Sequence, residues 1–121
     1  MQISTQKVNK TLENQIQKML VGSLCEINDP RQMEVVLSDL LTQPERVAMM
    51  QRLGIAIYLD KGRSYEDIKN NLKVSSATIA TVAENIAREG YSHLIRMIKA
   101  DEWAEAWTNR ITKGIRKFAQ E

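Results

Sequence analysis

Hydrophobic positions recur at helical spacing along most of this chain. The first series predicts an amphipathic helix that fades near Gly22, and it consists of Val8, Leu12, Ile16, Met19 and Leu20. Asn28, Asp29 and Pro30 form a helix start signal. The stripe of the second helix that follows consists of Met33, Val36, Leu37, Leu40 and Leu41. No alternation typical of strands persists anywhere, so the sequence predicts an all-α fold.

A third helix is predicted over residues 43–61, between two strong boundary signals. Thr42 and Glu45 have the spacing of a capping box, and Gly62 is a stop signal. Residues 49–59 are apolar nearly all round, which is typical of a helix that is buried on every side. One small domain rarely has enough material to surround such a helix. A second copy of the chain is therefore expected to help cover it.

Residues 64–86 predict two short helices joined by a tight corner, the geometry of a helix-turn-helix unit. Their inner faces consist of Tyr65, Ile68, Leu72, Ile79, Val82 and Ile86. Val74 fills the corner, and Ser75 or Ser76 can cap the second helix. An ordinary helical hairpin is the alternative.

The pattern changes again after Arg88, Glu89 and Gly90. A short helix is expected from Tyr91, Leu94, Ile95 and Ile98, and Asp101 can cap a last helix with an aromatic stripe. That stripe consists of Trp103, Trp107, Ile111, Ile115 and Phe118, and a basic stripe of Arg110, Lys113, Arg116 and Lys117 adjoins it. A solvated face is the favoured interpretation of the basic stripe. A phosphate-contacting surface and a membrane-binding surface are the alternatives.

The bulk properties favour a single domain of 121 residues. Within it we expect dimerisation helices over residues 1–61, the helix-turn-helix over 63–89 and C-terminal helices over 91–119. The net charge of +2 neither demands nor excludes nucleic acid. With no export leader, no membrane-length apolar run and the lone Cys25, a cytoplasmic protein is expected.

Little in the sequence favours an enzyme or a bound cofactor. There is no glycine-rich phosphate loop, nucleophile elbow or pair of catalytic carboxylates. His93 has no cysteine or acid cluster at metal-ligand spacing around it. We therefore expect no catalytic residues, no metal site and no cofactor other than a small-molecule effector.

Residues 40–87, about two-fifths of the chain, resemble the bacterial Trp repressor family. The resemblance rests on Leu41, Thr42, Glu45, Arg46, Arg52, Gly62, Ser64, Lys69, Asn70, Leu72, Ala77, Thr78 and Ile79. It implies a Trp repressor-like fold and an intertwined homodimer. The two second helices of the helix-turn-helix units would then enter successive major grooves, with half-sites roughly 34–36 Å apart. In that family a corepressor amino acid lies between the central helix and the helix-turn-helix.

The outer side of the second helix carries small hydroxyl and methyl groups, which can approach base edges closely. Base contacts are expected from Ser75, Ser76, Ala77, Thr78, Ala80 and Thr81, and phosphate contacts from Arg63, Lys69 and Lys73. Lys73 also occupies the corner position where glycine often supplies a left-handed backbone. Glu84 is unfavourable near phosphates unless Arg88 neutralises it.

The resemblance also implies a candidate effector site, formed by Leu41, Thr42, Arg52, Thr81, Val82 and Asn85. Arg52 matches the family arginine that binds the amino-acid carboxylate. On this apolar helix we expect its guanidinium to be buried and to need an anionic partner. A salt bridge to an acid of the other subunit is the alternative. Thr81 replaces the arginine of tryptophan-binding members and Val82 replaces a glycine, so both changes argue against tryptophan as corepressor.

Two functions follow from the sequence. The first is a dimeric, sequence-specific DNA-binding transcriptional regulator of the repressor type, with an amino-acid-like effector as the candidate gating ligand. The second is a helical protein–protein interaction module that has lost DNA binding. The first is the main interpretation, and the absence of lysine and arginine between Ser76 and Ala87, together with Glu84, motivates the second as the alternative.

Overall fold

The computed structural model describes residues 9–102, and the last predicted helix, with its aromatic and basic stripes, lies outside them. The described residues form helices and connecting turns without any strand, which confirms the all-α prediction. The chain divides into two compact units, with the boundary between Met49 and Met50. The proposed single domain and its three subdivisions stay a prediction.

The first unit begins with α1 (Lys10–Glu26) and α2 (Pro30–Leu40). The side chain of Asn9 caps α1 by accepting a hydrogen bond from the backbone N–H of Thr11 at 2.9 Å. α1 continues past Gly22, where the sequence predicted that it would fade. At the start of α2, Asp29 is the N-cap and Pro30 follows it in the first turn, as predicted.

α3 (Gln43–Asp60) begins at the predicted capping box. The hydroxyl of Thr42 accepts a hydrogen bond from the backbone N–H of Glu45 at 3.3 Å, and Glu45 Oε1 accepts one from the backbone N–H of Thr42 at 2.8 Å. At the other end, Gly62 adopts a φ of 76°, a conformation that glycine reaches without steric cost. The backbone N–H of Gly62 donates to the carbonyl of Leu59, so this turn satisfies an orphan acceptor at the helix end.

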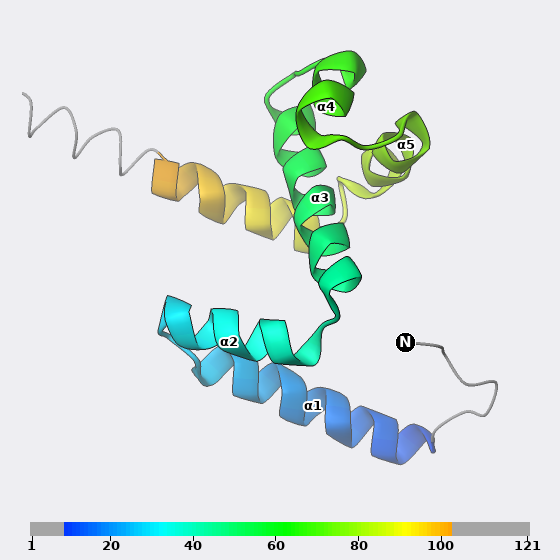
Figure 1. Cartoon of the computed structure of the whole chain (residues 1–121). Coiled ribbons are helices and arrows are strands. Elements are labelled where there is room, and N and C mark those ends of the chain that lie inside the picture. The colour runs from blue at the N-terminus through cyan, green and yellow to red at the C-terminus, as the bar shows by residue number, and fades with distance from the viewer. Residues whose placement is uncertain (1–8, 103–121) are drawn as a thin grey trace, which may run out of the picture. The chain divides into compact units, whose positions relative to one another are not determined.

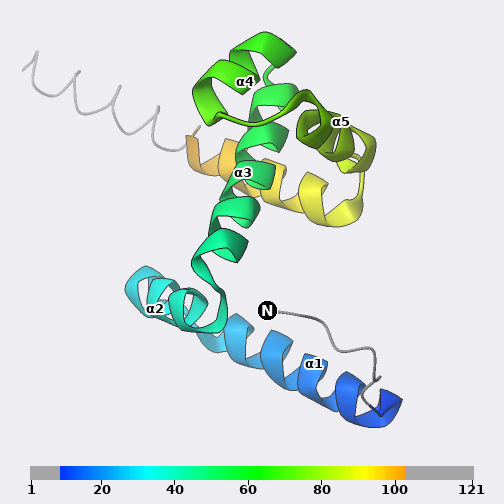
Figure 2. The same cartoon turned by 45° about the vertical axis from the view of Figure 1, so that its right-hand side comes forward.

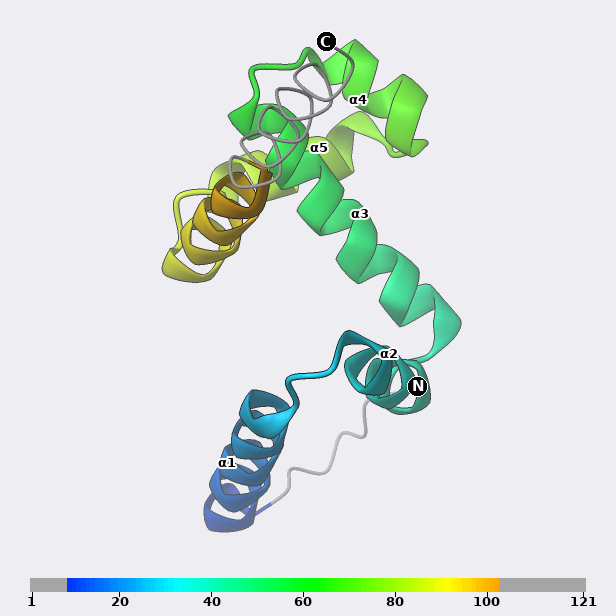
Figure 3. The same ribbon diagram turned by 90° about the vertical axis from the view of Figure 1, so that its left-hand side faces the viewer.

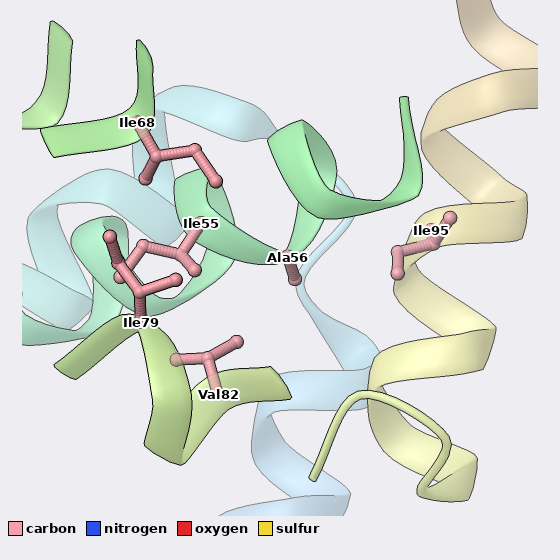
Figure 4. Close-up of a cluster of buried hydrophobic side chains, with 6 residues drawn as sticks. All are labelled: Ile55, Ala56, Ile68, Ile79, Val82 and Ile95. Carbon is pink, nitrogen blue, oxygen red and sulfur yellow. The ribbon is translucent and has the colours of Figure 1, made fainter. Parts of the chain in front are cut away.

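In the second unit, α4 (Tyr65–Leu72) and α5 (Ser76–Asn85) lie against the C-terminal half of α3 (Figures 1 and 2). A further helix over residues 89–102 crosses α3 on another side, and Figure 3 shows the same arrangement from a third direction. The buried core consists of Ile55, Ala56, Ile68, Ile79, Val82 and Ile95 (Figure 4). Each of these elements contributes at least one core residue, so the core fixes α4 and α5 on α3.

The helix over residues 89–102 corrects one boundary prediction. Asp101 and Glu102 continue this helix, so Asp101 is not the N-cap of a new helix that starts there. Two ion pairs join the helix to the end of α3: Lys99 Nζ lies 2.8 Å from Asp60 Oδ2, and Lys61 Nζ lies 3.3 Å from Glu102 Oε1. The break predicted between Arg88 and Gly90 is observed slightly earlier, over residues 86–88.

α3 is only partly buried within one chain, as the sequence led us to expect of a single copy, and its burial by a second copy stays a prediction. Ile55 and Ala56 are fully buried, whereas Met49 is 47% exposed and Met50 is 65% exposed. The apolar surface that the sequence assigned to the interior therefore lies partly on the outside of a single copy.

Candidate nucleic-acid interface

The corner between α4 and α5 consists of Lys73, Val74 and Ser75. Lys73 adopts the left-handed conformation, with φ 55° and ψ 48°, and its backbone N–H donates to the carbonyl of Lys69 at 2.9 Å. The sequence predicted this left-handed conformation at the corner. For a residue with a Cβ the conformation costs roughly 1–2 kcal/mol. Val74 is half-buried and packs against the core, as predicted. The two helices therefore have helix-turn-helix connectivity with a short, defined turn.

The side chains beneath α5 hold it at a fixed position. Ile79 and Val82 point toward Ile55 and Ile68, which come from α3 and α4 (Figure 4). The backbone of α3 also approaches α4 closely, because a Cβ added at Gly54 would lie 3.2 Å from Cδ1 of Leu72. A helix anchored in this way presents its opposite side to a partner in a defined orientation.

The predicted base-contacting residues lie together on α5 and at its start. Ser75, Ser76, Ala77, Thr78 and Thr81 are exposed, and Ala80 is half-buried. Ser75 is the N-cap, because its hydroxyl accepts a hydrogen bond from the backbone N–H of Thr78 at 3.2 Å. The sequence left Ser75 and Ser76 as candidate caps, and the structure shows that Ser75 is the N-cap.

Most hydroxyl groups on this surface already have partners within the helix. Ser75 Oγ lies 2.9 Å from Thr78 Oγ1, and Thr81 Oγ1 donates to the carbonyl of Ala77 at 3.0 Å. Asn85 Nδ2 similarly donates to the carbonyl of Thr81 at 2.8 Å. The unengaged groups of the α5 surface are therefore mainly methyl groups.

The three predicted phosphate contacts differ in their surroundings. Arg63 Nη1 lies 2.7 Å from Asp67 Oδ2, and its guanidinium carbon lies 5.6 Å from the centre of the Tyr58 ring. Lys69 and Lys73 are exposed, and neither forms an ion pair with another residue in the range 9–102. The two lysines therefore offer uncompensated positive charge, whereas much of the charge of Arg63 is neutralised.

Sequence reasoning missed the role of Asp67 as the partner of Arg63. Asp67 Oδ1 also accepts a hydrogen bond from Asn71 Nδ2 at 2.8 Å, and its backbone N–H donates to the hydroxyl of Ser64 at 3.1 Å. The spacing of four residues between Arg63 and Asp67 was the available signal, because such pairs face each other at the start of a helix.

The predicted effector residues fall in both units. Leu41 and Thr42 belong to the first unit, where Thr42 is engaged in the capping box of α3. In the second unit, Val82 is 3% exposed and belongs to the core, and Thr81 and Asn85 form the hydrogen bonds given above. Arg52 is exposed, so the prediction that its guanidinium is buried is wrong for a single chain.

Residues 9–102 contain neither a cluster of metal ligands nor a membrane-spanning helix. No group of three or more histidine, cysteine or acidic side chains in this range is placed to hold a metal ion. None of the helices in this range combines the length and the apolar character needed to cross a bilayer.

Comparison with protein families places the chain with known regulators. The family model described as Trp repressor protein matches residues 15–99, which is more than half of the chain. This match is wider than the stretch on which the resemblance was based, and it includes most of α1, all of α2 and most of the helix that starts at residue 89. Neither the curated proteins nor the solved structures gave a significant match.

Proposed function

The chain belongs to the Trp repressor protein family, a family of DNA-binding regulators, and from this membership we propose that it represses transcription by binding specific double-stranded DNA sequences. In this proposal the protein acts in the cytoplasm as a homodimer. The α5 helix of each copy enters the major groove. The observation that carries it is the exposed surface of Ser76, Ala77, Thr78 and Thr81 on a helix whose opposite side is fixed by Ile79 and Val82.

Two cations beside α5 that form no ion pair within residues 9–102 support the contact with DNA. Lys69 and Lys73 lie on α4 and at the corner, and each phosphate that such a cation neutralises releases counterions. Binding is then strongly weakened by salt. α5 itself carries no lysine or arginine, so it contributes base contacts rather than phosphate contacts.

The exposed apolar side chains of the first unit support a homodimer. None of the residues in α1 or α2 is buried in the single chain. The exposed large side chains of the first unit are Leu12, Ile16, Met19, Leu20, Val21, Val35, Leu40, Val47 and Met49. Clusters of exposed apolar side chains are typical of surfaces that contact another protein. A second copy that covers this surface would bring two α5 helices to one DNA duplex.

An amino-acid-like effector completes the proposal. The exposed guanidinium of Arg52 can bind a carboxylate, either from such an effector or from an acid of the second copy. A ligand changes DNA affinity only as far as it binds the DNA-competent arrangement of the dimer more tightly than other arrangements. Titration calorimetry of amino acids, with and without bound DNA, distinguishes a gated regulator from a constitutive one.

The function itself is tested by comparing Lys69→Ala with the unchanged protein on selected and random DNA fragments over a range of salt. Loss of one phosphate contact should weaken binding to all sequences and reduce the salt slope by roughly 0.9. Glu66→Ala, an exposed residue on the same helix, is the control. An identical salt slope for Lys69→Ala and the unchanged protein would contradict the phosphate role.

One observation favours the second candidate function, a protein-docking module. Glu84 is exposed near the end of α5, and Asp67 neutralises Arg63, so the cationic character of the surface is reduced. A docking module would retain almost no DNA at any salt concentration. The same titration therefore separates the two functions.

A further inference from the structure

The hydroxyl groups of α5 differ in how far they are available to a partner. Thr81 Oγ1 donates to the carbonyl of Ala77 at 3.0 Å, and Thr78 Oγ1 lies 2.9 Å from Ser75 Oγ. Ser75 Oγ in addition accepts from the backbone N–H of Thr78. Three of the four hydroxyl groups between residues 75 and 81 are therefore engaged within the helix.

Apart from the hydroxyl of Ser76, the groups that remain on this side are methyl groups arranged at helical spacing. Ala77, Ala80 and Thr81 are related by three and four residues, so they share one side of α5, and Thr78 lies beside them. Ala77, Thr78 and Thr81 are exposed and Ala80 is half-buried. We call these four residues the methyl face. When Thr81 donates to the helix backbone, its hydroxyl can no longer donate to a base but can still accept, and its Cγ2 methyl is free to contact a partner.

In the major groove, the methyl group at C5 of thymine is the apolar feature that marks one base. No lysine, arginine, asparagine or glutamine lies between Ser76 and Glu84 to form a bidentate contact with guanine or adenine. We propose that the methyl face selects thymine by packing against its C5 methyl group, with Thr81 as a specificity-determining residue. This inference rests on the proposed DNA binding and adds the base that α5 distinguishes.

Deoxyuridine tests the inference, because it differs from thymidine only by that methyl group. DNA fragments that bind the homodimer are first selected from a random pool, and each thymidine is then replaced in turn. At a thymidine that contacts the methyl face, the replacement should weaken binding about fourfold per half-site, the value expected for one buried methyl group.

Two variants of Thr81 separate methyl contacts from hydroxyl contacts. Thr81→Ser removes the methyl group and keeps the hydroxyl that donates to Ala77, whereas Thr81→Val keeps the shape and removes the hydroxyl. Thr81→Ser should bind about fourfold more weakly and lose its sensitivity to deoxyuridine at one position. Thr81→Val should keep that sensitivity. Circular dichroism and the thermal midpoint establish that both variants fold.

The outcomes are distinct. Thymine selection by the methyl face is overturned if DNA is selected but no thymidine replacement changes the affinity. It is also overturned if Thr81→Val loses affinity while Thr81→Ser keeps it. In both cases the proposed DNA binding stands. If no fragment is selected from the pool by a folded dimer, the proposed function fails and this inference fails with it.

Discussion

The guanidinium of Arg63 and the carboxylate of Asp67 form an ion pair of 2.7 Å across the first turn of α4. Arg63 precedes α4, and Asp67 lies on the same helix as Lys69, which has no such partner among residues 9–102. Arg63→Ala is therefore expected to weaken DNA binding less than Lys69→Ala.

Asp67→Asn should strengthen non-specific binding at low salt, because it releases the charge of Arg63 toward phosphates. Fluorescence anisotropy with a random duplex measures both effects.

Glu66→Gln is the matched control for Asp67→Asn. Both changes remove one negative charge from neighbouring positions on α4, but Glu66 forms no ion pair within the described range. If Glu66→Gln strengthens binding as much as Asp67→Asn does, the effect comes from net charge and not from release of Arg63.

Lys73 combines an unfavourable backbone conformation with a favourable charge. Its φ of 55° costs a residue with a Cβ roughly 1–2 kcal/mol relative to glycine. Lys73→Gly should raise the free energy of unfolding by about 1 kcal/mol, somewhat less than the full cost because glycine loses more chain entropy on folding. The same variant should weaken DNA binding, because it removes a phosphate contact. Urea denaturation and DNA titration measure the two opposite changes.

Lys73→Gln separates these two effects. It removes the charge but keeps a Cβ in the left-handed conformation, so DNA binding should fall without any gain in stability. Equal stabilities of Lys73→Gly and Lys73→Gln would show that the turn relaxes and that no conformational cost is present at this corner.

Local signals made much of the fold predictable from the sequence. The Thr42 and Glu45 capping box, the stop at Gly62 and the left-handed corner at Lys73 each depend on a few neighbouring residues. The inner residues Ile68, Ile79 and Val82 were predictable because burial follows helical spacing. These features needed no knowledge of distant contacts.

Features that depend on partners distant in sequence or on side-chain rotamers were not predictable. Continuation of the last described helix through Asp101 coincides with its attachment to α3 by Lys99 and Asp60. The hydrogen bond of 2.8 Å from Arg46 Nη1 to Ser38 Oγ joins two helices. The exposure of Arg52 departs from expectation because apolar neighbours in sequence do not cover it within one chain.

Glu45 gives the first unit a pH-dependent element. Hydrogen bonds from the backbone and then the side chain of Thr42 hold the pKa of Glu45 below its ordinary value of 4.5. A carboxyl whose pKa is lowered by folding stabilises the folded state above its ordinary pKa. This stabilisation should be complete above pH 4.5 and should disappear as the pH falls through the lowered pKa.

Glu45→Gln is expected to remove that contribution. Its urea midpoint should lie below that of the unchanged protein at pH 7, and the difference should shrink as the pH falls below 4.5. A difference that stays constant over this range would indicate that the carboxylate form has no special role in the cap.

Met19 offers the sharpest test of the dimer, because it is 61% exposed on a helix that has no buried residue. If a second copy covers α1, Met19→Glu buries an unpaired carboxylate in the interface and should shift the protein toward monomer. Loss of a dimer contact of this kind typically weakens association by several kcal/mol. Sedimentation equilibrium measures the shift, and Gln17→Glu, an exposed polar position on α1, is the control.

A monomer should also bind operator DNA more weakly, because each chain then places only one α5 on the duplex. Unchanged association of Met19→Glu would show that α1 lies outside the dimer interface.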